Sequence, residues 1–204
     1  YKNEEGYINL LKDTLNGEYK NTRNGNVFSQ FGCMIKFDNI SSSFPLITTK
    51  KVFFRGIVEE LLWFLRGSTD ANELKDKNVN IWNGNSSRKY LDSVGLIDFE
   101  EGELGPVYGW QWRMFGKKYI SKKSRESRES REENNIAVDQ IKYVITELLK
   151  ENSRRAVLSA WNPVDLNIMA LPPCHILYIF NKSKDGLCCH LTMRSSDLFL
   201  GLPF

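Results

Sequence analysis

Two apolar runs near the end of the chain, residues 176–180 and 187–193, stand on either side of the pair Asp185-Gly186. An Asp-Gly pair between two strand-like runs is a signal of a β-hairpin. Both runs are apolar at successive positions, so we expect both faces of the hairpin to be covered. The pattern therefore predicts a hairpin in the centre of a sheet, and the rest of the chain must supply the elements that cover it.

Helical and strand-like patterns alternate along that remainder. Apolar side chains have helical spacing over residues 7–15, 57–65 and 138–149, and glycines that favour a helix end follow the first two runs. Strand-like runs cover residues 27–37 and 155–161. The order lacks regular β-α-β spacing, which predicts an α+β fold, with a mixed sheet packed by helices, rather than a doubly wound fold.

Two shorter segments have their own signatures. Thr69 or Asp70 is placed to cap a short helix through Leu74, and Glu73 would support the cap. Residues 102–112 are dense in glycine and aromatic residues, which is typical of a loop that lines a pocket.

Length and charge exclude several function classes. A chain of 204 residues predicts one domain, residues 1–204. No uncharged apolar run is long enough to span a membrane, and the first residues lack the apolar core of a signal peptide, so we expect a cytoplasmic protein with no membrane partner.

The net charge is +3, and residues 117–133, with seven basic and four acidic side chains, account for all of it. A neutral body argues against nucleic acid as a partner.

Cysteine and histidine are too sparse for a metal site. Cys33, Cys174, Cys188 and Cys189 contain no C-x-x-C pair, and there are two histidines. We therefore expect reduced thiols and no bound metal.

Residues 117–135 include the repeated triplet Arg-Glu-Ser and few apolar side chains. This composition predicts a disordered, solvated insertion within the domain. A phosphorylated or RNA-binding arm is the alternative interpretation.

The run Pro172-Pro173-Cys174-His175 is the sharpest chemical signal. Two prolines stiffen the backbone before the cysteine, which suits a side chain that must be aimed, although the run taken alone fits a buried structural cysteine better. Arginine forks suit a dianion, and the candidates are Arg23, Arg154, Arg155 and Arg194, unless they cap helices or meet surface carboxylates. Glu60 lies among apolar residues and is either a solvent-facing residue or a buried functional acid.

Five segments together resemble the thymidylate synthase family. They are EELLWFLRGST at 59–69, LGPVYGWQWR at 104–113, AWNP at 160–163, LPPCH at 171–175 and RSSDLFLGLPF at 194–204. The resemblance implies a methyltransferase that converts dUMP to dTMP, with 5,10-methylenetetrahydrofolate giving both the carbon and a hydride and leaving as dihydrofolate. It also implies a homodimer whose sheet face forms the interface, and arginines donated across that interface.

The resemblance assigns roles residue by residue. It implies that Cys174 is the nucleophile, with Glu60, Tyr108 and Arg194 as further catalytic residues. Residues implied to bind dUMP are Arg23, Arg154, Arg155, Arg194, Ser195, Ser196 and Asp197. Residues implied to bind the folate are Lys50, Trp82, Asn85, Leu171, Asp197, Leu200, Gly201 and Phe204.

Some positions depart from the family pattern and keep alternatives open. Met193 replaces the usual glutamine, as in some pyrimidine hydroxymethylases, so a dUMP or dCMP hydroxymethylase is one alternative. Trp82 favours methylation, because a bulky indole can shield the methylene intermediate from water. A non-catalytic dimerising or RNA-binding remnant is the other alternative, since the family's chain continues beyond Phe204. For that reason we expect this sequence to be a C-terminally truncated piece.

Overall fold

A computed structural model describes residues 2–22, 25–126 and 136–204 of the chain. The chain divides into two compact units. The first contains residues 1–53 and 197–204, and the second contains residues 54–196.

The first unit begins with helix α1 (Lys2–Thr14), which confirms the helix predicted from residues 7–15. Strands β1 (Glu18–Thr22) and β2 (Gly25–Ser29) follow as an antiparallel pair, with Glu18 opposite Ser29. The strand predicted over 27–37 is therefore wrong in its extent. Beyond Ser29, residues 30–37 pair with no strand in the described part of the chain, and Phe31 and Met34 are 100% and 82% exposed. Apolar residues alone do not make a strand where nothing pairs with them.

One buried carboxylate fastens α1 to the segment before α2. Glu4 Oε1 accepts hydrogen bonds from the backbone N–H groups of Thr48 (2.7 Å) and Thr49 (2.9 Å), and Oε2 accepts from Thr48 Oγ1 (2.8 Å). These donors lower the pKa of Glu4 to about 2.

The second unit is built around helices α2 (Phe54–Leu65) and α6 (Tyr108–Met114). Their aromatic side chains form the centre of its core, where Phe64 lies 4.7 Å from Tyr108 and 5.4 Å from Trp112 between ring centroids. Residues 102–112 were expected to be a loop, but α6 begins at Tyr108, and the side chains of Tyr108 and Trp112 are buried in this core. The shorter helices are α3 (Asn72–Lys75), α4 (Asn83–Ser86), α5 (Arg88–Ser93), α7 (Lys122–Glu126) and the 3₁₀ turn η1 (Leu166–Ile168).

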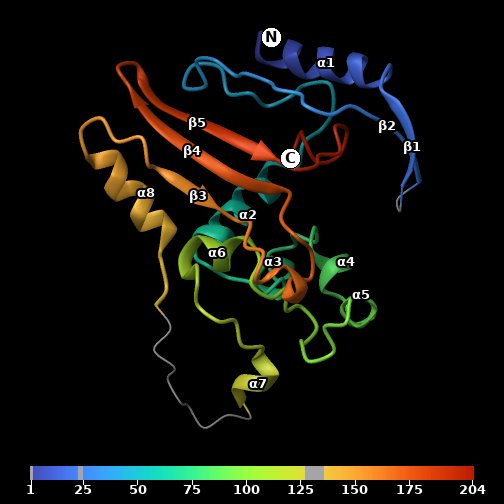
Figure 1. Ribbon diagram of the computed structural model, residues 1–204. Helices are drawn as coiled ribbons and strands as arrows, with labels where there is room; N and C mark the ends of the chain where they lie inside the picture. The colour runs from blue at the N-terminus through green and yellow to red at the C-terminus, as the bar shows by residue number, and fades with distance from the viewer. Residues whose placement is uncertain (1, 23–24, 127–135) are drawn as a thin grey trace. The chain divides into compact units, whose positions relative to one another are not determined.

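A three-stranded sheet with the order β3-β4-β5 completes this unit (Figure 1). The strands are β3 (Val157–Ser159), β4 (His175–Ser183) and β5 (Gly186–Met193). Helix α8 (Gln140–Leu149) lies beside β3 and β4, with Asp139 accepting a hydrogen bond from the N–H of Lys142 at its start (3.0 Å).

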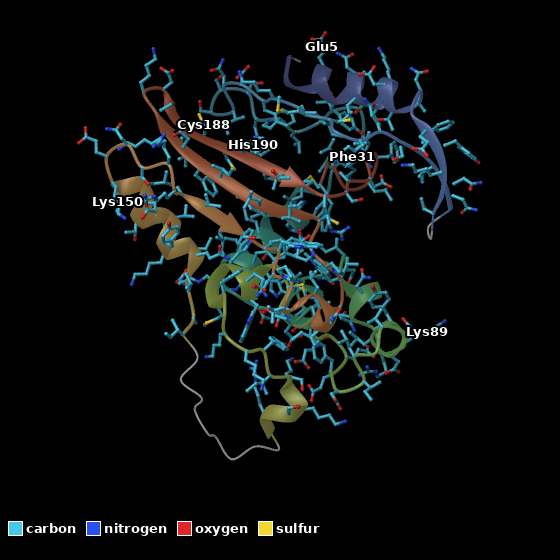
Figure 2. All side chains as sticks on the ribbon, viewed as in Figure 1. Glu5, Phe31, Lys89, Lys150, Cys188 and His190 are labelled. Atoms are coloured by element: carbon cyan, nitrogen blue, oxygen red, sulfur yellow. The ribbon has the colours of Figure 1, made fainter. Side chains whose placement is uncertain are left out.

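The predicted hairpin is confirmed, with Gly186 in its turn at φ +136°. Its predicted central position holds for β4 but not for β5. Strand β5 is an edge strand, and six of its eight residues are exposed, including Cys188 and His190 (Figure 2). The α+β class is confirmed. The described strands pair only antiparallel, whereas a mixed sheet was expected.

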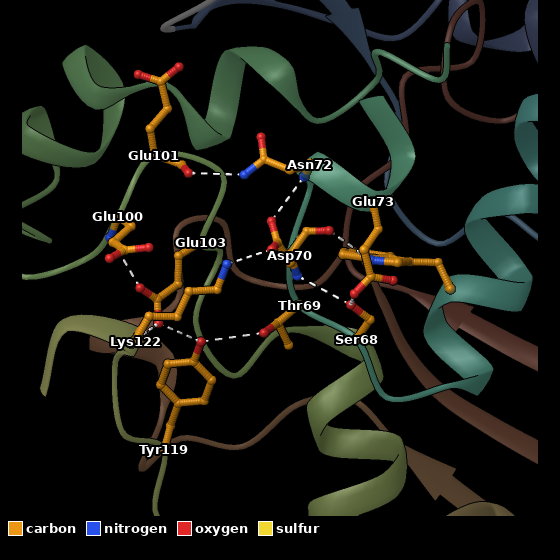
Figure 3. A network of polar contacts seen from close by, with 11 residues as sticks. Ser68, Thr69, Asp70, Asn72, Glu73, Glu100, Glu101, Glu103, Tyr119 and Lys122 are labelled. Atoms are coloured by element: carbon orange, nitrogen blue, oxygen red, sulfur yellow. Dashed lines mark hydrogen bonds and ion pairs between the residues drawn. The ribbon is translucent and has the colours of Figure 1, made fainter. Parts of the chain in front are cut away.

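The first part of the expected insertion is held by a buried polar network (Figure 3). Glu103 is 0% exposed and accepts hydrogen bonds from Tyr119 Oη (2.8 Å) and from the N–H of Lys122 (2.9 Å). Lys122 Nζ also pairs with Asp70 at 2.5 Å. The expected disorder therefore does not hold for residues 117–126. Residues 127–135 lie outside the described part of the chain.

Candidate active site

Cys174 stands between Pro173, which is buried, and the first residue of β4. Its backbone is held from both sides. The N–H donates to Tyr108 Oη (2.7 Å), and the carbonyl accepts from the N–H of Arg194 (3.0 Å). The side chain is partly exposed, and the sulfur is a free thiol, like those of the other three cysteines. The structure thus holds the backbone of a partly exposed cysteine in place, which fits the interpretation in which the two prolines aim its side chain.

Arg194 lies against the same loop. Its Nε donates to the carbonyl of Pro173 (2.8 Å), and one terminal nitrogen donates to the carbonyl of Pro172 (2.9 Å). The guanidinium also lies 5.8 Å from the ring centroid of Trp161. Residues far apart in the sequence therefore converge, and a permanent positive charge is fixed beside the backbone of the cysteine.

Tyr108 connects the cysteine loop to the core. It occupies the first turn of α6, is 6% exposed, and lies 5.7 Å from the ring of His175 and 6.2 Å from that of Trp82. Burial raises the pKa of Tyr108 to about 12, so the phenol stays protonated at neutral pH. Because its oxygen already accepts the N–H of Cys174, its own proton can be directed to another acceptor.

Glu60 on α2 supplies a titratable group to the same region. Its Oε1 accepts a hydrogen bond from Trp82 Nε1 (2.7 Å), and Trp82 is 7% exposed. Burial raises the pKa of Glu60 to about 7, although the indole donor acts in the opposite direction. The group can therefore hold or release a proton near neutral pH, and its half-buried position and its bond to a buried indole favour a functional acid over an ordinary solvent-facing residue.

Arg154 and Arg155 follow α8 and are both exposed. Among the described residues, neither side chain has a hydrogen bond or an ion pair. The helix-capping alternative for this pair therefore has no support in the described contacts. Arg23 lies outside the described residues.

The remaining predicted residues fall into two sets. Ser195, Ser196, Asn85 and Leu171 belong to the second unit, where Ser196 Oγ is buried without a hydrogen-bond partner in the described part of the chain. The set in the first unit is Lys50, Asp197, Leu200, Gly201 and Phe204. There, Lys50 Nζ donates to the carbonyl of Phe199 (2.5 Å) and lies 4.1 Å from its ring centroid.

Asp197 has a local structural task as well. Its Oδ1 accepts the N–H groups of Phe199 (2.9 Å) and Leu200 (2.7 Å), so it caps the turn that contains Gly201. A ligand would have to bind the second carboxylate oxygen.

Sequence reasoning missed two supporting residues. It gave no role to Trp161, which lies under Arg194, or to Gln111, which is 0% exposed and bonds Asp165 and the carbonyl of Pro106. Both lie inside the segments that carried the family resemblance. For Gln111 the available signal was a polar residue between two tryptophans within such a segment.

In the described ranges, no group of histidine, cysteine, aspartate or glutamate side chains is arranged to hold a metal ion. No helix found there is both long enough and apolar enough to cross a membrane.

A thiol on a fixed backbone, an acid with a pKa near neutrality and a buried phenol are groups that nucleophilic attack coupled to proton transfer requires. Comparison with known proteins identifies the family. The family model for thymidylate synthase matches residues 5–204, and the chain belongs to the thymidylate synthase family.

The curated relatives agree with this assignment. The chain is 48% identical over 200 residues to bifunctional dihydrofolate reductase-thymidylate synthase 1 of Arabidopsis thaliana, covering 97% of this chain and 37% of the relative. It is 50% identical over 202 residues to the bifunctional protein of Daucus carota, with 97% and 37% covered. Thymidylate synthase of Herpesvirus ateles is 47% identical over 204 residues, which are 98% of this chain and 68% of that protein. The chain thus spans under two fifths of the length of these two plant relatives.

Proposed function

We propose that the protein is a methyltransferase that converts dUMP to dTMP, and that residues 1–204 belong to its single catalytic domain. The observation that carries this proposal is the anchored Cys174, whose backbone bonds Tyr108 on one side and Arg194 on the other. All three residues lie in segments that resemble the family. The names of the relatives favour the same reaction, since each contains thymidylate synthase.

In the proposed mechanism the Cys174 thiolate adds to C6 of the uracil ring, and the electron pair of the C5–C6 double bond moves towards O4. C5 thereby becomes a carbon nucleophile. The co-substrate, 5,10-methylenetetrahydrofolate, supplies the methylene carbon that C5 attacks and later a hydride, and it leaves as dihydrofolate. Loss of the C5 proton and expulsion of the cysteine restore the ring.

Glu60 and Tyr108 have the proton-transfer roles. With a pKa of about 7, Glu60 can exchange a proton with O4 through water. Tyr108, held at the cysteine backbone, would act beside the C5 proton. Trp82 packs against Tyr108 and bonds Glu60, so its indole can exclude water from the methylene carbon. This favours methylation over the hydroxymethylase alternative, in which water takes the place of hydride.

The arginines would bind the 5′-phosphate, with Ser195 and Ser196 beside them. Arg23 and Arg194 would come from the same chain, and Arg154 and Arg155 from the second subunit of a homodimer. Two observations support the dimer. The exposed arginines have no ion pair with described residues, and the edge strand β5 exposes Leu187 (59%) and Leu191 (40%).

The folate would bind to the residues that the family resemblance assigns to it. In the second unit these are Trp82, Asn85 and Leu171. Four free thiols fit the reducing cytoplasm as the proposed location.

A covalent trap tests the nucleophile. With 5-fluoro-dUMP and methylenetetrahydrofolate, the C5 fluorine cannot leave as a proton does, so the full-length protein should accumulate an adduct on Cys174 that intact-mass spectrometry detects. The variant Cys174→Ser should form none. Cys33→Ser, Cys188→Ser and Cys189→Ser are the matched controls and should form it normally. An adduct on Cys174→Ser would refute the assignment.

A further inference from the structure

The loop between α8 and β3 carries the two exposed arginines on a backbone that is fixed at both ends. At its far end, the carbonyl of Arg155 accepts the N–H of Val157 (2.9 Å), and the carbonyl of Ala156 accepts the N–H of Phe180 on β4 (2.9 Å). At its near end, the N–H of Lys150 bonds the carbonyl of Glu147 in the last turn of α8 (3.1 Å).

The side chain of Glu147 adds a second attachment at the near end. Glu147 is 5% exposed, and its carboxylate points to the loop rather than to solvent. Its Oε1 accepts from Lys150 Nζ (2.5 Å), at the end of α8 (Figure 2), and its Oε2 accepts from Ser153 Oγ (2.6 Å). These two donors lower the pKa of Glu147, so it is ionised at neutral pH.

Ser153 links the carboxylate of Glu147 to the backbone of Arg155. Its Oγ donates to Glu147 and also accepts the N–H of Arg155 (3.3 Å). Between Lys150 and Ser153 the chain turns through Asn152 at φ +57°, a left-handed conformation that few residue types adopt readily. A carboxylate that bonds both sides of this turn holds the turn in that shape.

We infer that Glu147 is a positioning residue that acts through Ser153 to present Arg154 and Arg155 to the phosphate of the nucleotide. This inference rests on the proposed function, because it concerns how the proposed phosphate ligands are held. An arginine binds an anion more tightly when its backbone is already fixed, since less conformational freedom is lost on binding. The proposed mechanism gives Glu147 no role in the chemical step, so its loss should affect nucleotide binding and spare that step.

Steady-state kinetics test the inference. Glu147→Ala and Ser153→Ala should each raise the KM for dUMP by about tenfold, the size expected for one impaired charge-assisted contact, with kcat within about twofold of wild type. Glu147→Gln keeps an acceptor for Ser153 and should lie between wild type and Glu147→Ala. The matched control is Glu151→Ala, which removes an exposed carboxylate from the same loop and should leave the KM unchanged.

A double-variant experiment separates positioning from general destabilisation. In an Arg154→Ala/Arg155→Ala background, Glu147→Ala should not raise the KM further, because the residues through which it acts are gone. Amide hydrogen exchange of residues 150–155 should accelerate in Glu147→Ala and not in Glu151→Ala.

The outcomes distinguish the two levels of the proposal. A wild-type KM in Glu147→Ala, or the same rise with and without the arginines, would overturn the positioning role and leave the proposed function intact. If the wild-type enzyme turns over and the Arg154→Ala/Arg155→Ala variant has the same KM for dUMP, the phosphate role on which the inference rests would be overturned. Faster exchange together with a raised KM supports it.

Discussion

At the residue scale, the raised pKa of Glu60 makes the stability of the protein depend on pH. Its pKa is raised from 4.5 to about 7, so the folded protein keeps the proton to a higher pH than the unfolded chain does. Below pH 4.5 both states are protonated and the group has no effect on stability. Between pH 4.5 and 7 the folded state binds more protons, and stability falls as pH rises. Above pH 7 the full penalty, up to about 3 kcal/mol, is present.

Glu60→Gln tests this sign. Glutamine keeps an acceptor for Trp82 but has no charge, so its free energy of unfolding should match that of wild type near pH 4 and exceed it at pH 8. Urea unfolding at several pH values measures the difference. The same variant should lose most of its kcat, because it cannot exchange a proton. A variant that is less stable than wild type at pH 8 would contradict the burial of the charge.

Single residues were predictable where their neighbours in the sequence determine their setting. Two prolines before Cys174 indicated an aimed thiol, and apolar flanks gave burial as one of two settings for Glu60. The bonds from Arg194 to the carbonyls of Pro172 and Pro173 were not predictable, because they join segments about twenty residues apart. The hydrogen bond from Trp82 to Glu60 was not predictable for the same reason, since 22 residues separate them.

At the element scale, Glu4 fastens α1, and its pH dependence has the opposite sign. The pKa of Glu4 is lowered from 4.5 to about 2, so its contribution is fully present above pH 4.5 and is lost as pH falls towards 2. Glu4→Gln should therefore unfold at lower urea than wild type at pH 6, and the two midpoints should approach each other below pH 4. Glu5→Gln, at an exposed neighbouring position, is the control. Equal midpoints at pH 6 would show that the carboxylate bonds to Thr48 and Thr49 contribute nothing.

Elements were predictable where one periodic run forms the whole element. Helix α8 and the β4–β5 hairpin are of this kind, since their apolar spacing and turn residues are local. Helix α6 was missed because its glycine and aromatic content is typical of loops, and packing of Tyr108 and Trp112 around Phe64 overrides that preference. The strand expected beyond Ser29 does not form, for the converse reason: a strand needs a partner, and periodicity does not reveal one.

At the scale of the whole molecule, the second unit exposes apolar side chains on its edge strand β5 and on helix α2. Helix α2 exposes Val58, Leu61 and Leu62 by 38–48%, although the helix is strongly apolar. Sequence patterns mark such residues as buried, because they cannot tell burial within one chain from burial against another. A second copy of the chain is the proposed cover for the sheet, and it is also what would give Arg154 and Arg155 a partner.

Mixed dimers test whether the arginines act across the interface. We expect Cys174→Ser to be inactive and Arg154→Ala/Arg155→Ala to be nearly inactive at dUMP concentrations well below the wild-type KM. If sites are shared, a heterodimer of the two full-length variants has one site with an intact cysteine and intact partner arginines. Random mixing in equal amounts makes about half of the dimers heterodimers, so about one quarter of wild-type activity should return.

The control is a mixture of tagged and untagged wild-type chains, which shows that subunits exchange under the same conditions. If the arginines served their own chain, each heterodimer would combine one chain without a nucleophile and one without phosphate ligands, and neither site would work. Activity that stays at the level of the separate variants, while the wild-type chains exchange, would therefore contradict the shared site. Recovery that rises with the heterodimer fraction would require each arginine pair to reach the cysteine of the other subunit.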